Sequence, residues 1–396
     1  MLPHFIHNRI RNVLLALMFL GCIYLPMVDH FFQFDATASL TENRTLNQAP
    51  NLILPTVSVM ENPADIDAWY ELLQTVARYP SNFNRYYNDH FGFRKSLVRM
   101  HSHMALSGWP AKGNVIIGRN GYLFLGEART RESYQASTSF STDELVSWKA
   151  ELERRRDWLA AQGIDYLLVI APEKSTIYPE FMPANIPRIG TQTRMDQLMT
   201  YFAENSNLQV IDLRPVLVRG RTEHPTYYRT DTHWNDWGAF LVSQSIIVEL
   251  TKNFPDMQPP NIGDYTFNEE KMPGGDLARM MALGDSLSDD GIVVEALRSN
   301  SAYPADTDIT LPPDVPDWNQ PEAREMSDIE LPALIMFRDS FGKSLIPFLS
   351  EHFRRSLYLH QYSFDESTIL LESPDIVIQE IAERELQGSA PPESNY

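Results

Sequence analysis

The sequence predicts an α/β protein with a parallel central sheet and helices on both faces. Uninterrupted apolar runs recur from residue 166 onward, and such runs are typical of strands buried on both sides. Stretches with helical spacing separate most of these runs, an alternation typical of doubly wound sheets. The chain has 396 residues, 43% of them apolar and 21% charged, which is enough for one large folded domain or two ordinary ones.

Residues 1–34 predict an N-terminal membrane anchor. Basic residues precede an uncharged apolar run from Val13 to Val28, and the positive-inside rule then places the rest of the chain outside the inner membrane. The run is slightly short for a span of about 20 residues. Three alternatives therefore stay open: a buried helix, a cleaved signal peptide ending near Ala38, and a lipid attached to Cys22.

Residues 35–135 predict an extension in front of the sheet. The first part, 41–55, is polar and resembles a linker, whereas apolar residues at helical spacing predict helices over 65–104. Two short apolar runs on either side of Asn120-Gly121 predict a β-hairpin over 115–125.

Residues 136–386 predict the sheet domain. Its first helix is expected to begin at Ser141, because Glu144 three residues later completes a capping box. Between 254 and 330 the alternation stops and Pro, Asp and Asn become frequent, so this stretch predicts an insertion beside the site. The polar residues 387–396 predict a disordered tail. The expected strands are 166–171, 208–213, 331–337, 356–360 and 375–378, and the expected helices are 194–205, 237–251 and 344–353.

Charge and cysteine content exclude several classes of protein. Lys and Arg total 33 against 52 Asp and Glu, a formal net charge of −19, which argues against nucleic-acid binding because phosphate neutralisation needs a basic face. The single cysteine rules out an intramolecular disulfide, a cysteine zinc site and an iron–sulfur cluster. No cofactor is predicted.

Two motifs carry the residues of nucleophilic catalysis. Asp231 stands two residues before His233, close enough to hold the imidazole Nδ1 and stabilise the imidazolium, which leaves the other nitrogen as a general base. Ser340 follows the strand expected over 331–337, where the chain turns from the carboxyl end of a strand into a helix. Backbone N–H groups at such a turn favour a developing oxyanion. We therefore predict Ser340 as nucleophile, His233 as base and Asp231 as orienting acid.

Two other interpretations compete with this assignment. Asp231 and His233 could instead bind a metal ion, although no third ligand is obvious in the sequence. Gly284-Asp285-Ser286-Leu287 spells the motif of the GDSL lipolytic enzymes. The residues in front of it are expected to be helical and not a buried strand, so Ser286 would lack the sheet edge that a nucleophile of this fold needs.

At these residues the chain resembles the alginate O-acetyltransferases, SGNH-hydrolase-like proteins that acetylate bacterial exopolysaccharides in the periplasm. The paired Asp-Thr-His and Asp-Ser-Phe elements, in this order, are the specific part of the resemblance. The matching segments are 42–44, 89–94, 117–124, 172–174, 231–234, 275–277, 338–341 and 374–378.

The resemblance implies an SGNH-hydrolase-like (flavodoxin-like) sheet that is circularly permuted, because the histidine element precedes the serine. It implies O-acetyl transfer to a polysaccharide through Ser340, His233 and Asp231, with acetyl groups supplied by a multi-spanning membrane acyltransferase. Together with the anchor predicted over residues 1–34, it implies a single-pass inner-membrane protein with its catalytic domain in the periplasm. The SGNH asparagine that binds the oxyanion has no clear counterpart. Expected donor, sugar or oxyanion contacts are Lys174, Tyr178, Tyr228, Arg229, Arg338 and Arg384.

Two other functions fit the same sequence. A carbohydrate acetylesterase would use the same triad with water as acceptor, and a membrane-tethered assembly protein of a secretion complex would not need the triad at all. The charge of −19 also favours a neutral or weakly charged acceptor polymer as much as anionic alginate.

Overall fold

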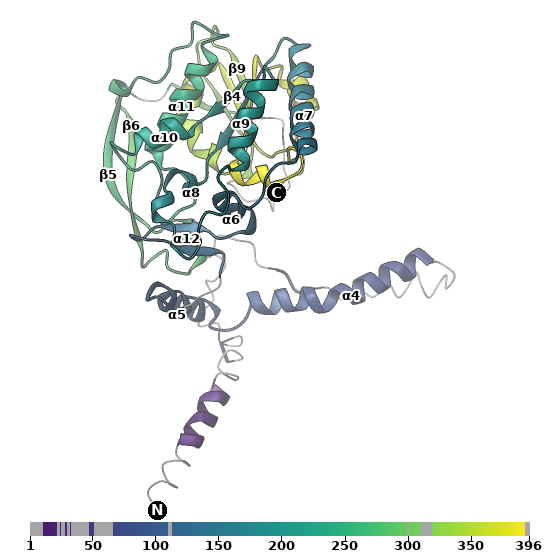
Figure 1. Ribbon diagram of the computed structural model, residues 1–396, viewed down its shortest axis with the longest axis vertical. Helices are drawn as coiled ribbons and strands as arrows, with labels where there is room; N and C mark the ends of the chain where they lie inside the picture. Colours follow the sequence, from purple (N-terminus) through teal and green to yellow (C-terminus); the bar gives the residue numbers. More distant parts are fainter. Residues whose placement is uncertain are drawn as a thin grey trace, which may run out of the picture. The chain divides into compact units, whose positions relative to one another are not determined.

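The computed structural model describes residues 11–21, 24, 28–29, 32, 47–50, 66–109, 113–298, 301–307, 309 and 319–392. Figure 1 shows its helices and strands along the chain. Contacts divide the chain into two compact units, Met1–Lys112 with Arg279–Asp285, and Gly113–Ala278 with Ser286–Tyr396. The linker expected over 41–55 falls mostly outside the described residues.

The first unit contains two helices where helices were expected. They are α4 (Ile66–Asp89) and α5 (Arg94–Leu106). Phe93 separates them in the left-handed conformation, with φ of 57°. The Asp89 carboxylate accepts hydrogen bonds from the backbone and side-chain nitrogens of Asn47, at 2.9 and 2.6 Å.

The prediction of a single-pass inner-membrane protein is wrong. Within the part of the chain that the structure describes, no helix is both long and apolar enough to cross a membrane.

The second unit is built on a seven-stranded sheet in the order β4-β3-β11-β9-β10-β8-β7. The five strands expected from the sequence are parallel neighbours. The strands are β3 (Asp165–Ala171), β4 (Val210–Asp212), β7 (Tyr303–Ala305), β8 (Glu322–Glu325), β9 (Ala333–Arg338), β10 (Arg355–His360) and β11 (Ile376–Ala382).

The sheet is mixed and not purely parallel, which corrects the prediction. β8 pairs antiparallel with β10, and β7 pairs antiparallel with β8. Both extra strands come from the expected insertion. Since β8 reads Glu-Ala-Arg-Glu, it has no apolar run from which a buried strand could be recognised.

Helices cover both faces of the sheet, as expected. Leu167 and Val169 of β3 pack in one core cluster, with residues of α10 and α11. Leu168 and Ile170 pack in the other, with residues of α7 and α9, because successive strand residues point to opposite faces. These four helices are α7 (Thr142–Ala160), α9 (Arg194–Asn205), α10 (Arg214–Gly220) and α11 (Asp236–Leu250) (Figure 1).

The other helical segments of this unit are short. The capping box of Ser141 and Glu144 at the start of α7 is confirmed. The α-helices are α6 (Ala128–Gln135), α8 (Lys174–Ile177), α12 (Asp276–Met280), α13 (Ile346–Leu349) and α14 (Glu366–Glu372). The 3₁₀ segments are Pro179–Phe181, Ile262–Asp264, Phe341–Leu345, Ser350–His352 and Glu383–Gln387.

Two antiparallel hairpins complete the unit. The first, β1 (Val115–Ile117) with β2 (Leu123–Leu125), is the expected one, and its turn has left-handed Asn120 and Gly121. The second, β5 (Tyr265–Pro273) with β6 (Ser288–Ala296), is the long hairpin beside α10 and α11 in Figure 1. It lies in the insertion, and its Phe267 ring packs edge-on against Trp237 of α11 at 5.1 Å.

Part of the expected tail is held by the rest of the unit. The Gly388 carbonyl accepts hydrogen bonds from Trp148 Nε1 at 3.1 Å and from Arg194 at 3.3 Å.

Candidate active site

The segments that follow β3, β9 and β11 meet at one edge of the sheet. These three strands are parallel neighbours, so their carboxyl ends lie side by side, where ligands bind in sheets of this class. Lys174 follows β3, Ser340 follows β9 and Arg384 follows β11.

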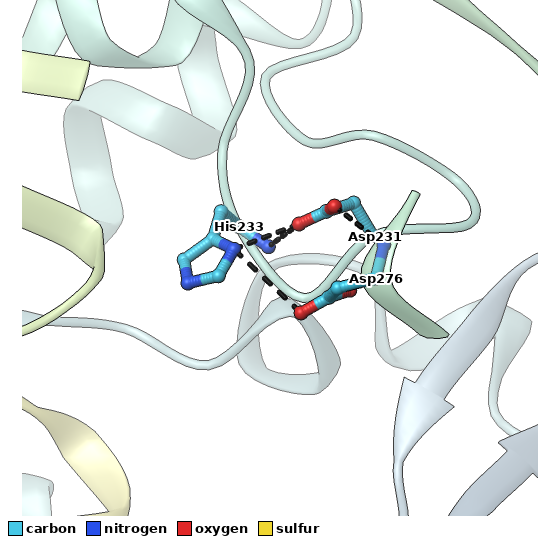
Figure 2. A group of neighbouring side chains, drawn as sticks. All are labelled: Asp231, His233 and Asp276. Carbon is cyan, nitrogen blue, oxygen red and sulfur yellow. Dashed lines mark hydrogen bonds and ion pairs between the residues drawn. The ribbon is translucent and has the colours of Figure 1, made fainter. Parts of the chain in front are cut away.

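Asp231 and His233 lie in the loop that leads into α11. The His233 Nδ1 is 2.7 Å from Asp231 Oδ1 (Figure 2), and the backbone N–H of His233 donates to the same oxygen at 3.1 Å. Asn235 begins α11 directly afterwards, since its side chain accepts from the Gly238 N–H at 3.0 Å. The carboxylate therefore fixes the orientation of the ring.

Ser340 lies at the turn after β9, 107 residues from His233 in sequence, and its Oγ is 2.8 Å from His233 Nε2. Ser340 is half-buried, and the side chain of His233 is 26% exposed. A hydroxyl, an imidazole and a carboxylate thus form one hydrogen-bonded chain that solvent can reach.

Aromatic contacts join the two motifs. The His233 ring packs edge-on against Phe341 at 4.8 Å, and Trp234 packs against the same ring at 4.9 Å. Trp234 Nε1 also donates to Ser344 Oγ at 2.6 Å. Trp234 and Phe341 therefore pack the loop before α11 against the turn after β9.

The residue before Ser340 anchors the turn from inside the protein. The fully buried Asp339 accepts from the Phe341 N–H at 2.7 Å and from the Tyr362 hydroxyl at 3.1 Å. Its own N–H donates to Glu380 Oε2 at 2.8 Å. Burial and the nearby Asp339 carboxylate raise the pKa of Glu380 well above its usual range.

The helix expected over 344–353 is broken into short segments. A 3₁₀ turn over Phe341–Leu345 is followed by α13 and by a second 3₁₀ turn. Pro347 stands in the first turn of α13, where its missing N–H is tolerated but ends the preceding hydrogen-bond ladder. The backbone N–H groups at the Ser340 turn are consequently a local feature and not the end of a long helix dipole.

Asp276 is a second carboxylate beside His233. Its Oδ2 is 3.8 Å from His233 Nδ1 (Figure 2). Its backbone N–H donates to Asp231 Oδ2 at 2.7 Å, and its Oδ1 accepts from the Thr232 N–H at 2.7 Å. Asp276 thus supports Asp231 and adds negative charge next to the imidazole.

The surroundings of His233 act on its pKa in opposite directions. Burial lowers it and so does the Arg384 charge, whereas the hydrogen bond and charge of Asp231 and the charge of Asp276 raise it, and the net pKa lies above the usual 6.5. The hydrogen bond from His233 holds the Asp231 pKa well below its usual range, despite the opposing effect of burial.

We predict that activity rises with pH through this raised His233 pKa, because only the neutral imidazole can accept the serine proton. Asp276→Asn removes one of the charges that raise the pKa, so the rising limb of the pH–rate profile should move to lower pH. The dependence of kcat/KM on pH, compared between the wild type and Asp276→Asn, measures this shift. Asp290→Asn, which changes an exposed carboxylate, should leave the limb in place, and an unmoved limb in Asp276→Asn would contradict the electrostatic role.

Gly275 lets the Asp276 segment lie against Asp231. A Cβ at this position would be 2.3 Å from the Asp231 Cβ and 2.6 Å from its Oδ2. We predict that Gly275→Ala displaces Asp231 and lowers kcat by about 100-fold, since a misplacement of about 1 Å has effects of that order. Gly263→Ala is the matched control, because the nearest atom to its Cβ would lie 3.4 Å away. Steady-state kinetics with thermal unfolding of both variants tests this.

Lys174 and Tyr178 lie behind the histidine loop. The Lys174 amine is buried and donates to the carbonyls of Tyr228, Arg229 and Asp231, at 3.0, 3.0 and 2.5 Å. Burial lowers its pKa to about 8, although nearby acids oppose this. The Tyr178 hydroxyl, also buried, accepts from the Thr226 N–H at 2.8 Å. Both side chains are positioned to support the loop.

Tyr228 and Arg229 belong to the outer part of the same loop. Arg229 pairs with Asp290 at 2.7 Å, and its N–H donates to the buried Asp289 at 2.8 Å. The Tyr228 N–H donates to the His233 carbonyl at 3.3 Å. Asp289 therefore attaches the loop to the β5–β6 hairpin, a connection that the sequence did not indicate.

The two remaining arginines differ in their exposure. Arg338 is fully buried, and its side chain donates to the Asp339 carbonyl at 3.0 Å. Arg384 is 12% exposed and pairs with Glu173 at 2.8 Å. Its guanidinium lies 5.8 Å from the centre of the Phe341 ring, so Arg384 lies beside the residue that follows Ser340.

The structure supplies the third group that a metal site at Asp231 and His233 had lacked. One ligand atom each from Asp231, His233 and Asp276 lies within 4.8 Å of the others. However, both Asp231 oxygens accept hydrogen bonds from neighbouring nitrogens. The three groups therefore fit an acid–histidine network better than a ligand set.

Sequence reasoning missed the roles of Asp276 and Glu380. Gly275-Asp276 was part of the family resemblance but suggested no contact with His233. Glu380 stands within the apolar strand β11, and a charged residue in such a run was a usable signal. Ser286 stands in a turn after α12 and before β6, with no strand in front of it.

Comparisons with known proteins agree with the resemblance. Residues 115–308 match the family described as SGNH hydrolase-like domain, acetyltransferase AlgX. The probable alginate O-acetylase AlgJ of Azotobacter vinelandii is 24% identical over 195 residues, 49% of this chain and 47% of that protein. Its counterpart in Pseudomonas aeruginosa is 26% identical over 176 residues, 44% and 43% of the two chains. The matched segment thus spans less than half of either relative.

The fold also has a counterpart among solved structures. Bacillus cereus PatB1 superimposes with a TM-score of 0.50 at 16% identity, over 70% of this chain and 98% of that one. Over residues 115–308, the chain is thus similar to the SGNH hydrolase-like domain of the acetyltransferase AlgX family.

Proposed function

We propose that this protein is an O-acetyltransferase that acetylates polysaccharide hydroxyls through an acetyl-enzyme on Ser340. The observation that carries the proposal is the continuous chain from Ser340 Oγ to His233 Nε2, at 2.8 Å, and from His233 Nδ1 to Asp231 Oδ1, at 2.7 Å. The names of the relatives support acetyl transfer as the reaction class. The histidine element precedes the serine, as a circularly permuted SGNH arrangement would have it.

In the first step, Ser340 Oγ attacks the carbonyl carbon of an acetyl donor while His233 Nε2 takes the serine proton. Asp231 stabilises the imidazolium that forms. The backbone N–H of Ser340 is proposed as the first oxyanion donor, with the charge of Arg384 nearby. When the tetrahedral intermediate collapses, the bond to the leaving group breaks, the leaving group takes the proton from His233, and acetyl-Ser340 remains.

In the second step, His233 accepts the proton of an acceptor hydroxyl as that oxygen attacks acetyl-Ser340. The ester bond to Ser340 breaks, and the proton returns from His233 to the serine oxygen. The sugar leaves as its acetyl ester, and the enzyme is regenerated. The membrane acyltransferase expected to supply the acetyl group stays a prediction.

Mass spectrometry of the protein after incubation with 4-nitrophenyl acetate tests the first step. We expect an acetyl group on the peptide that contains Ser340, and none on Ser340→Ala. An adduct on another side chain would overturn the assignment. Adding an oligosaccharide then separates transfer from hydrolysis, because free acetate without acetylated sugar would indicate an esterase.

A further inference from the structure

A cavity of about 640 Å³ is lined by residues of the segments that follow β2, β10 and β11. Its size is within the range of roughly 300–1,000 Å³ typical of small-molecule sites. The polar lining comes from Glu127, Arg129, Tyr362, Arg384 and Glu385, and the segment 388–392 closes one side.

Two lining side chains connect this cavity to the nucleophile. The Tyr362 hydroxyl donates to Asp339, the residue before Ser340, at 3.1 Å. The Arg384 guanidinium lies 5.8 Å from the ring of Phe341, the residue after Ser340. The charge of Arg384 also acts on the pKa of His233. The cavity is thus connected, through Tyr362 and Arg384, to the residues on either side of Ser340.

The charges around the cavity do not favour an anion. Arg129 pairs with Glu385 at 2.7 Å, and Arg384 pairs with Glu173 at 2.8 Å. Glu127 adds a further carboxylate to the lining. An incoming carboxylate would therefore meet two cations that are each already paired with a carboxylate, together with the further carboxylate of Glu127, in a chain of net charge −19.

The same groups suit hydroxyl groups. Carboxylate oxygens accept hydrogen bonds from hydroxyls, and a guanidinium has five N–H donors, so a single ion pair leaves others available. We propose that this cavity is the acceptor subsite and that it binds an uncharged sugar unit. The proposal rests on the function proposed above and narrows its substrate class to neutral polysaccharides.

Equilibrium binding to the full chain tests the subsite without any turnover. The probes are a neutral glucose oligosaccharide and a uronic acid oligosaccharide of the same length. We expect the neutral probe to bind at least about tenfold more tightly, about 1.4 kcal/mol, and with little dependence on salt. Equal or tighter binding of the uronate probe would overturn the proposal.

Two tryptophan substitutions locate the site. Ser389 is exposed and lines the cavity, so Ser389→Trp should fill it and lower the affinity for the neutral probe about tenfold. Ser301→Trp places the same side chain at an exposed position outside the lining and should bind as the wild type does. Thermal unfolding verifies that both variants are folded. If Ser389→Trp binds the neutral probe with unchanged affinity, the cavity is not the acceptor subsite.

The two proposals fail in different ways. An acetyl adduct on Ser340 without binding of the neutral probe would overturn the subsite and leave the acetyl-enzyme intact. Binding of the neutral probe without an adduct on Ser340 would overturn the acetyl-enzyme and leave the subsite intact.

Discussion

Ser340→Ala should lower acetyl transfer by at least about 10⁴-fold, because the variant has no oxygen to carry the acetyl group. Losses of this order are typical when one member of such a triad is removed, since the others cannot act without it. The Ser340 hydroxyl is half-buried and ends the hydrogen-bonded chain, so the substitution removes one contact and should hardly change the melting temperature. Initial rates with a chromogenic acetyl ester, together with thermal unfolding, measure both effects.

Ser286→Ala is the matched control for this experiment. It removes the hydroxyl of the Gly-Asp-Ser-Leu segment, which has the letters of a nucleophile motif but follows a helix and not a strand. We expect its rate to equal that of the wild type. A large loss of rate in Ser286→Ala together with full activity in Ser340→Ala would show that Ser286, and not Ser340, is the nucleophile.

Asp231→Asn should lower kcat by about 10⁴-fold while leaving the fold intact. Asp231 accepts hydrogen bonds through both oxygens, from His233 through Oδ1 and from the Asp276 N–H through Oδ2. An asparagine has only one such oxygen. If that oxygen keeps the bond to Asp276, its NH₂ group faces His233 Nδ1 and forces the ring proton onto Nε2. The nitrogen that faces Ser340 Oγ at 2.8 Å could then no longer accept the serine proton.

Nitrogen NMR of the histidines distinguishes this tautomer change from a general loss of structure. In the wild type at high pH we expect the His233 proton on Nδ1, and in Asp231→Asn on Nε2. Asp256→Asn changes an exposed aspartate and should alter neither rate nor tautomer. A variant Asp231→Asn that keeps both the rate and the wild-type tautomer would show that Asp231 has no orienting role.

Much of the fold was predictable because buried parallel strands leave a local signature. The runs 166–171 in β3, 333–337 in β9 and 376–378 in β11 are continuous and apolar, as is typical of strands covered on both faces. β7 and β8 were not predictable in the same way, because β7 is a three-residue edge strand that contains a proline and β8 is a four-residue strand with three charged residues. β8 joins the sheet by pairing with β10, which lies downstream in sequence, and β7 joins it by pairing with β8.

The roles of charged residues around the site were less predictable. Lys174 was expected to contact substrate, whereas its amine donates to three backbone carbonyls of the histidine loop. Asp276 is 43 residues beyond His233, and no local sequence pattern predicts that its carboxylate lies 3.8 Å from the imidazole. Arg129 and Glu385 form an ion pair across 256 residues, so the charge balance of the cavity could not be read from the chain.

The sequence alone determined which residue types could perform the chemistry and on which edge of the sheet they would stand. Both are local properties, because the Asp-x-His spacing and the turn after a buried strand are each fixed by a few neighbouring residues. Only the tertiary structure decided that Ser340 and His233 meet, that a second carboxylate joins them, and that the cations beside them are already paired. Contacts of this kind depend on the packing of segments more than a hundred residues apart, for example Phe341 against His233 and Trp234. The hydrophobic effect that drives this packing is non-directional. It therefore leaves no local sequence pattern that would reveal which segments pack together.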